Sequence, residues 1–423
     1  MTDESQTQNR IDRRTLLRTG AATGVLTLAG CLGGDGGGSP TTTATTTETA
    51  TPTQTETATD TPTETPTQPT DEIPVSGESV PELRPLDEAT VEYMTELDYG
   101  AGSLALYRDE EMELVRGYGW GDRERTEPVD PQAMYRIGSI SKLFTADAVL
   151  RLVEAGELAL EDEFYPLLSV DPPDGEPADE RIREVTVEQL LNHAGGWNRF
   201  ENANPLFNPL VVVESLGLDD TPARDDFVRY VLDQPLQFDP GTDNVYSNIG
   251  YVMLSLVVEG VTGESFESVV SANLFEAADA TDIHLGATRP ENRRPDEIWY
   301  DDSEQCENVF TRDGSAACAD YGIVLSAFSG AGGFVARAPD LARALDELQW
   351  FWLNGQPYES LESVFEQIDQ STLAWFGSIY DSFGYAGRRP DGWVVTLFND
   401  RDLRGNPQQI HTQLDEAFSS IDN

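Results

Sequence analysis

Lysine is almost absent from this sequence, whereas acidic residues are in large excess. Lys142 is the only lysine among 27 Lys and Arg residues, which face 76 Asp and Glu residues for a formal net charge of −49. Repulsion by phosphate would oppose binding to DNA or RNA, so we expect no nucleic-acid partner. At molar salt the Debye length is only ~3 Å, which would relieve repulsion among the carboxylates. The composition therefore predicts a halophilic protein that unfolds in dilute buffer.

The patterns of cofactor sites are also missing. The three histidines lie far apart in the sequence, with no metal-ligand spacing between them. The glycine-rich segment 32–38 follows no predicted strand, so it does not match a dinucleotide fingerprint. The many carboxylates are better explained as a solvated surface. We therefore predict neither a metal nor another cofactor.

The first thirty residues have the features of an export signal. Arg13-Arg14 resembles a twin-arginine signal, and the apolar run from Ala21 to Ala29 is too short to span a bilayer. The run leads into Cys31, as in a lipobox of the haloarchaeal lipoprotein type. We expect a protein held by a lipid on Cys31 at the outer face of the cytoplasmic membrane, with no other membrane contact. A simple secretory signal with a coincidental cysteine is the alternative.

Residues 31–79 are predicted to form a stalk. Threonine makes up seventeen of the thirty residues from Thr41 to Thr70, and none of the thirty is a large hydrophobe. Such a segment cannot bury a core and is expected to be extended. Its hydroxyl groups are either glycosylated or unmodified, and in both cases the segment would separate the membrane from the folded domain.

The folded domain is predicted to cover residues 80–423. Tryptophans, tyrosines and periodic apolar runs after residue 85 argue against an acidic disordered chain. Both outer parts combine helices with strands, predicted at residues 103–107, 112–118, 373–379, 382–386 and 393–398. The middle is mostly helical and irregular. We therefore expect an α/β lobe from residues 80–165 and 321–423, and a helical lobe from residues 166–320.

Two further cysteines fall in one polar stretch of the predicted helical lobe. Cys306 and Cys318 could pair, because an exported chain meets an oxidising environment. A bridge would pin an otherwise mobile insertion. Two free thiols are the alternative, and the sequence favours neither.

The solitary lysine lies three residues after a serine on a predicted helix. Arginine cannot lose its proton at any working pH, but a desolvated lysine can, so position 142 is predicted to need a removable proton. Ser139 and Lys142 would project from the same face of a helix that begins near Ser139. A neutral Lys142 could then take the Ser139 proton and activate the hydroxyl. Ser139 as a simple helix cap is the alternative, and Ser141 has no lysine at the same spacing.

A tyrosine and an asparagine lie two residues apart about a hundred residues later. In extended backbone, Tyr246 and Asn248 would face the same way. A phenol near the Lys142 ammonium would have its pKa lowered and could relay protons to a leaving group. Asn248 offers a donor and an acceptor, able to hold Lys142 and orient a substrate carbonyl. A packed loop tyrosine and a helix-capping asparagine are the alternative explanation.

Three segments together resemble the class C β-lactamase family, which includes D-alanyl peptidases and esterases. They are Tyr135–Thr145, Leu190–Gly196 and Pro240–Tyr251, and the resemblance covers roughly residues 85–400. It implies an α/β fold of the β-lactamase type, with an antiparallel sheet flanked by helices and an inserted helical lobe. It also implies that Ser139 is the nucleophile, Lys142 the base, and Tyr246 and Asn248 their partners. His193 matches a structural histidine of the family and is not assigned to the site.

The third motif of this family is altered here. Its best match is Trp375-Phe376-Gly377, followed by Ser378 and, further on, by an expected hairpin turn at Asp391-Gly392. This register implies an oxyanion hole made by the backbone N–H groups of Ser139 and Ser378. Trp375 replaces the cation that would bind a substrate carboxylate and resembles the esterase branch, so Trp375 and Gly377 are predicted to line an apolar pocket. A tryptophan of the core is the alternative.

Together these features predict an extracellular serine hydrolase. We expect cleavage of a small ester, or less readily an amide, through an acyl intermediate on Ser139. A β-lactamase or a hydrolase of D-amino peptides is one alternative. A non-catalytic binding module on the same fold is another, because the third motif is altered.

Overall fold

The computed structural model describes residues 72–200, 204–348, 374–399 and 405–421, together with the backbone of residues 352–353 and 356–357. The predicted export signal with Arg13, Arg14 and Cys31 lies outside the described residues, as does the stalk up to residue 71. The fold is the predicted α/β fold, with an antiparallel sheet flanked by helices.

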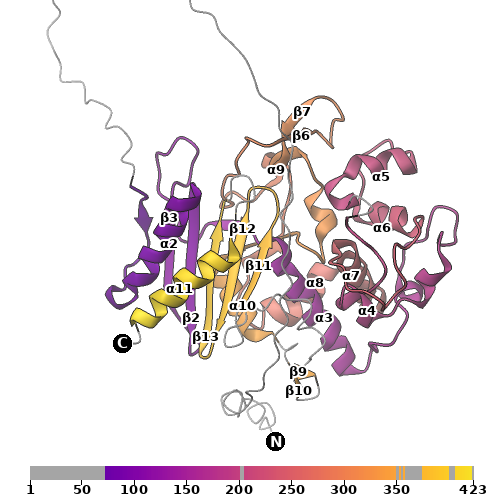
Figure 1. The fold of residues 1–423 in the computed structure, drawn as a ribbon, viewed down its shortest axis with the longest axis horizontal. Coiled ribbons are helices and arrows are strands. Elements are labelled where there is room, and N and C mark those ends of the chain that lie inside the picture. Colours follow the sequence, from indigo (N-terminus) through magenta and orange to yellow (C-terminus); the bar gives the residue numbers. More distant parts are fainter. Residues whose placement is uncertain are drawn as a thin grey trace, which may run out of the picture. The chain divides into compact units, whose positions relative to one another are not determined.

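One antiparallel sheet joins the two ends of the described chain. Its strand order is β1-β3-β2-β13-β12-β11, and every neighbouring pair is antiparallel. The early strands, indigo in Figure 1, thus pair with the late strands, in yellow. The strands cover Val75–Ser76 (β1), Ala101–Arg108 (β2), Glu111–Gly119 (β3), Ala374–Ser378 (β11), Phe383–Arg389 (β12) and Gly392–Phe398 (β13).

Both faces of this sheet are covered, so its central strands are buried on both sides. Leu104 and Leu106 of β2 pack in the core beneath helices α2 and α11, whereas Ala101 and Ala105 face the larger core that contains α10. This alternation follows from the two-residue period of a strand. Figure 1 shows α11 lying across the sheet beside α2. The helices cover Arg84–Leu97 (α2), Ala338–Glu347 (α10) and Pro407–Ile421 (α11).

Most of the remaining helices form the lobe at the other side of Figure 1, around the buried helix α7, whereas α9 lies beside strands β6 and β7. These helices cover Ser141–Ala155 (α3), Val187–Leu191 (α4), Pro209–Leu216 (α5), Arg224–Leu232 (α6), Asn248–Thr262 (α7), Phe266–Val270 (α8) and Cys318–Tyr321 (α9). Among the described residues no single helix is long and apolar enough to cross a membrane; only α7 with the segment up to Phe275 passes that test, as a pair bent by 79°.

Short strands connect the two parts of the fold. A three-stranded sheet has the order β4-β8-β5, and β6 and β7 form a hairpin closed by the disulfide between Cys306 and Cys318, whose Cα atoms are 4.9 Å apart. The strands cover Met134–Arg136 (β4), Ile283–Leu285 (β5), Gln305–Glu307 (β6), Ser315–Ala317 (β7), Phe334–Arg337 (β8), Trp352–Leu353 (β9) and Gln356–Pro357 (β10).

Two boundaries predicted from the sequence are wrong. The ordered domain begins before residue 80, because β1 pairs with β3 and the Ser76 hydroxyl donates to the carbonyl oxygen of Val129. The hairpin turn between β12 and β13 consists of Pro390 and Asp391, because Gly392 already pairs with Arg389. Both errors are small shifts, of the kind that depends on strand pairing rather than on local sequence.

Candidate active site

Ser139 lies on a tight turn between a strand and a long buried helix. β4 ends at Arg136, the 3₁₀ turn η2 covers Gly138–Ile140, and α3 begins at Ser141. Gly138 has a φ of +51°, in the left-handed region that favours glycine. A Cβ atom there would come 2.6 Å from the backbone nitrogen of Ser378. The glycine therefore allows β11 to approach the turn that carries Ser139.

Lys142 is buried on the first turn of α3, with its amine beside the serine. Its Nζ lies 3.4 Å from Ser139 Oγ and donates to Asn248 Oδ1 at 2.7 Å and to the carbonyl oxygen of Ala331 at 2.5 Å. Burial, helped by the nearby Arg199 guanidinium, lowers the pKa of Lys142 well below its usual value. A neutral amine has two N–H groups, which these two acceptors occupy. Its lone pair then remains for the Ser139 proton.

Tyr246 contacts the same serine from the other side of the site. Its hydroxyl lies 2.5 Å from Ser139 Oγ, and its ring lies 4.7 Å from Lys142 Nζ. The sequence predicted that the lysine would lower the pKa of this phenol, and this is wrong. Burial raises the pKa of Tyr246 to about 12, against a weaker lowering by the hydrogen bond to Ser139 and by Arg199. Tyr246 therefore keeps its proton and can donate it.

Asn248 is held beside Lys142 by the start of α7. Ser247, with extended backbone, caps this helix, and its hydroxyl accepts from the N–H of Gly250. The asparagine therefore does not cap the helix, and its carbonyl is available to Lys142. His193 supports the same loop, because its Nδ1 accepts from the N–H of Ser247 at 3.2 Å. Burial, helped by the neighbouring Lys142 and Arg199 side chains, lowers the pKa of His193 to about 3, so it is a neutral positioning group.

The backbone amides of Ser139 and Ser378 lie on segments that pack directly against each other. The N–H of Ile379 donates to the Ser382 carbonyl at 3.2 Å, so the alternation of an antiparallel ladder turns the N–H of Ser378 to the opposite edge of β11. η2 packs against β11 at these two amides, because a Cβ atom on Gly138 would lie 2.6 Å from the Ser378 nitrogen and one on Gly377 would lie 2.6 Å from the Ser139 nitrogen. Two N–H groups beside a nucleophile are suited to a developing oxyanion.

A cavity of about 580 Å³ opens beside these groups. Its described lining contains no aspartate or glutamate, and no group of His, Cys, Asp or Glu in the described parts of the chain could hold a metal ion. Trp375 lines the cavity but is only 4% exposed and packs against the Trp393 ring, so it belongs to the core as well as to the wall. The described lining residues are Ser139, Lys142, Arg199, Phe200, Asn204, Phe207, Tyr246, Asn248, Ala374, Trp375, Phe376 and Ser378.

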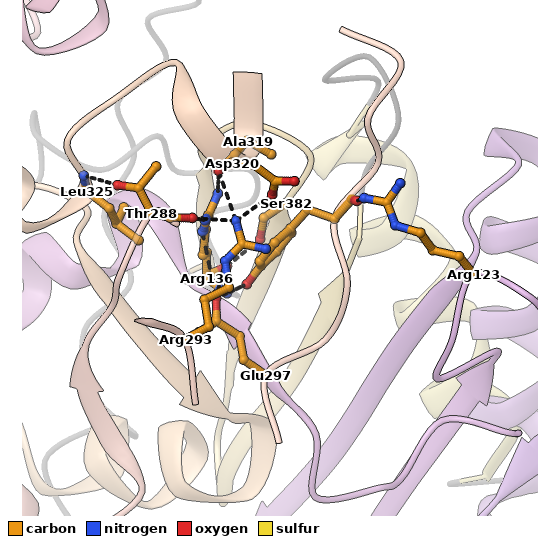
Figure 2. A network of polar contacts seen from close by, with 10 residues as sticks. Arg123, Arg136, Thr288, Arg293, Glu297, Ala319, Asp320, Leu325 and Ser382 are labelled. Carbon is orange, nitrogen blue, oxygen red and sulfur yellow. Dashed lines mark hydrogen bonds and ion pairs between the residues drawn. The ribbon is translucent and has the colours of Figure 1, made fainter. Parts of the chain in front are cut away.

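A buried polar network lies behind the turn, and sequence reasoning missed it (Figure 2). The Arg136 and Arg293 guanidinium groups lie over the Tyr300 ring at 4.1 and 4.8 Å, and each is 3.9 Å from the Glu297 carboxylate. Arg293 also pairs with Asp320 at 2.6 Å. Burial raises the pKa of the Glu297 carboxyl, and the two arginines oppose this rise. The available sequence signal was Arg136 itself, a charged residue in the otherwise apolar strand β4.

This network joins the segments that carry the two amides. The Ser382 hydroxyl, at the end of the β11–β12 turn, donates to the carbonyl oxygen of Arg136. The Arg136 side chain donates in turn to the carbonyl oxygen of Ala319 at 2.9 Å. Ala319 directly follows Cys318, so the disulfide lies next to one anchor of the network. β4, which leads to Ser139, and the turn after Ser378 are thus tied together.

Known proteins share this fold and parts of this sequence. Esterase EstB of Burkholderia gladioli is 32% identical over 224 residues, which are 50% of this chain and 53% of that protein. The chain spans about half the length of the curated relatives that it matches. A D-amino acid amidase from Ochrobactrum anthropi has a similar fold, with a TM-score of 0.59 at 18% identity over 81% of this chain and 98% of the amidase.

A second solved structure has the same fold. The octameric penicillin-binding protein homologue from Pyrococcus abyssi matches with a TM-score of 0.57 at 21% identity, over 79% of this chain and 76% of that one. The model of the Beta-lactamase family matches residues 86–408, which is well over half of the sequence. The chain therefore belongs to the Beta-lactamase family of serine hydrolases.

Proposed function

We propose that this protein hydrolyses a small ester through an acyl intermediate on Ser139. The observation that carries the proposal is the position of the buried Lys142 amine, whose Nζ donates to Asn248 and to the Ala331 carbonyl while Ser139 Oγ lies at 3.4 Å. Such an amine is a base poised beside a hydroxyl nucleophile. A non-catalytic binding module would have no use for this arrangement.

In the acylation step the Ser139 proton passes to Lys142 as Oγ bonds to the ester carbonyl carbon. The carbonyl oxygen becomes an oxyanion that accepts hydrogen bonds from the N–H groups of Ser139 and Ser378. When the bond to the leaving alcohol breaks, Tyr246 gives its proton to that oxygen and recovers one from Lys142. Water then attacks the acyl carbonyl carbon and gives a proton to Lys142. As the bond to Ser139 Oγ breaks, Lys142 returns that proton to Oγ, and the acid product leaves.

An ester is favoured over a β-lactam or a D-amino peptide by the third motif. Trp375 stands where the resembling family places a cation, and it gives an apolar wall beside the nucleophile. The likeness to an esterase supports the same choice. Faster turnover of nitrocefin than of nitrophenyl esters would reverse this preference.

The test is the Ser139→Ala variant with nitrophenyl acyl esters and a fluorophosphonate probe. We expect loss of both ester hydrolysis and covalent labelling. Ser141→Ala is the matched control, because Ser141 is the neighbouring serine and its buried hydroxyl only accepts from the N–H of Phe334 at 3.4 Å. Undiminished hydrolysis by the Ser139→Ala variant would remove this residue from the mechanism.

We also propose that the enzyme is displayed outside the membrane and works at high salt. The arginine pair, the apolar run and Cys31 support export and lipid anchoring, and the net charge of −49 supports a need for screening. A Cys31→Ser variant is expected to leave the membrane fraction. Equal melting temperatures in dilute and molar salt would contradict the halophilic part.

A further inference from the structure

Arg199 reaches the cavity from the loop after α4. It is exposed and lines the cavity, and its guanidinium carbon lies 4.9 Å from the centre of the Tyr246 ring and 4.8 Å from that of Phe200. Aromatic rings occupy the faces of a guanidinium group, whereas its N–H donors lie in the plane. The stacking therefore orients this side chain and leaves its donors available to a ligand.

Arg181 and Arg183 of this region have carboxylate partners, whereas Arg199 has none among the residues that the structure describes. Arg181 pairs with Asp179, and Arg183 pairs with Glu176. Within the described residues, Arg199 makes ring contacts only, with no ion pair or hydrogen bond. In a chain with 76 acidic residues, an arginine without a carboxylate partner is available for an anion from outside.

The described lining of the cavity around Arg199 offers an anion a cation and no acidic side chain. Burial lowers the pKa of Lys142 well below its usual value, so Arg199 is the one cation of that described lining that cannot lose its proton. The outer surface carries a large negative excess, so an anionic substrate gains most from a cation inside the cavity. A planar guanidinium group matches a carboxylate with two parallel hydrogen bonds.

We propose that Arg199 binds a carboxylate of the substrate, and that the substrate is an ester whose alcohol half carries this carboxylate, an acylated hydroxy acid. The inference rests on the proposed function. Arg199 stacks on Tyr246, whose hydroxyl protonates the leaving alcohol, so a carboxylate bound there belongs to the alcohol half. Arg199 thus supplies, from another loop, the cation that is missing at Trp375. It would bind the alcohol half of the substrate rather than the acyl half.

A matched pair of esters tests the charge requirement. 3-Acetoxybenzoate and 3-acetoxybenzamide share the acetyl group and differ in the charge of the leaving phenol. We expect wild-type kcat/KM to favour the acid. 4-Nitrophenyl succinate and 4-nitrophenyl butyrate place the same difference on the acyl half, where we expect no such preference. A preference on the acyl half alone would overturn the assignment to the alcohol half.

The variants Arg199→Gln and Arg199→Lys separate substrate recognition from a general effect on catalysis. With Gln we expect the ratio of kcat/KM for the acid over the amide ester to fall about 10–100-fold, mostly through KM, because a hydrogen bond to a charged group is lost. Lys should retain part of the ratio. Arg183→Gln is the control, because this variant loses the same charge outside the cavity. The Arg183 guanidinium lies 4.9 Å from the centre of the Tyr165 ring. An unchanged ratio in Arg199→Gln would overturn the proposal.

These ratios should be measured in molar salt, where charges are screened beyond ~3 Å. A preference that persists there comes from direct contact between Arg199 and the substrate rather than from long-range attraction. Binding of the product 3-hydroxybenzoate to the Ser139→Ala protein, followed by calorimetry, tests Arg199 without turnover. We expect at least about 10-fold weaker binding after Arg199→Gln, and equal binding would contradict the proposal. Failure of the hydrolase itself would instead appear as absent fluorophosphonate labelling of Ser139 in the wild type.

Discussion

Arg136 and Lys142 stand three residues before and three residues after Ser139, and the structure treats these two buried cations in opposite ways. Arg136 is 0% exposed and Lys142 is 1% exposed. Arg136 lies near Glu297, as does Arg293, which also pairs with Asp320. Lys142 has an amide oxygen and a carbonyl oxygen as its acceptors, and no carboxylate among the described residues.

The difference shows how burial can produce either a structural charge or a base. A buried cation near carboxylates keeps its proton, and its hydrogen bonds then fix the segments around it. A buried cation without a carboxylate is too costly to keep, so a lysine loses its proton. Arginine cannot take this course, which explains why the one lysine of the chain lies here.

Replacement of Lys142 should have the largest effect. We expect Lys142→Arg and Lys142→Met each to reduce kcat by about 10³-fold or more, because neither side chain can accept the serine proton. Circular dichroism in molar salt would check that both variants fold. A fully active Lys142→Arg enzyme would contradict the assignment of the base.

Removal of Arg136 tests the other half of the comparison. We expect Arg136→Met to lower the free energy of unfolding by about 3–5 kcal/mol, since it breaks a buried charge cluster and leaves carbonyl acceptors without donors. The measurement is urea unfolding in molar salt. The double variant with Glu297→Gln should lose less than the sum of the two single variants, and strict additivity would show that these charges are not coupled.

Loss of the disulfide should weaken the same network by a smaller amount. The double variant Cys306→Ser/Cys318→Ser opens a bridge between residues 12 apart. We expect a loss of about 2–3 kcal/mol in unfolding free energy, because the unfolded chain is no longer constrained. Treatment of the wild type with a reductant should lower its melting temperature to that of the variant. Equal stability of all three would show that the bridge contributes nothing.

The pH dependence should report the neutral lysine directly. Because the pKa of Lys142 is lowered and only its neutral form accepts a proton, kcat/KM should rise with pH through that lowered pKa and then level off. Tyr246 must stay protonated, and its pKa of about 12 places any decline at very alkaline pH. Arg199→Gln removes a cation that disfavours the ammonium, so the rising limb should move to higher pH. A shift to lower pH would contradict this electrostatic role.

The sequence predicted the parts of the site that are local in the chain. The spacing of Ser139 and Lys142, and that of Tyr246 and Asn248, selected four residues that the structure brings into contact. Arg199 was not predicted, because nothing in its local sequence indicates that it enters a cavity. Arg136 was overlooked although a charged residue in an apolar strand signals a buried partner.

The sequence by itself determined the net charge, the apolar periodicity of the helices and strands, and the order of the motifs. These follow directly from which residues are present and from their order along the chain. Only the tertiary structure decided how deeply each group is buried and which distant groups surround it. Burial reversed the expected direction for the pKa of Tyr246 and lowered the pKa of Lys142, which has no carboxylate partner within the described part of the chain. The cost of desolvating a charge depends on everything packed around it, so segments far apart in the sequence set that cost together.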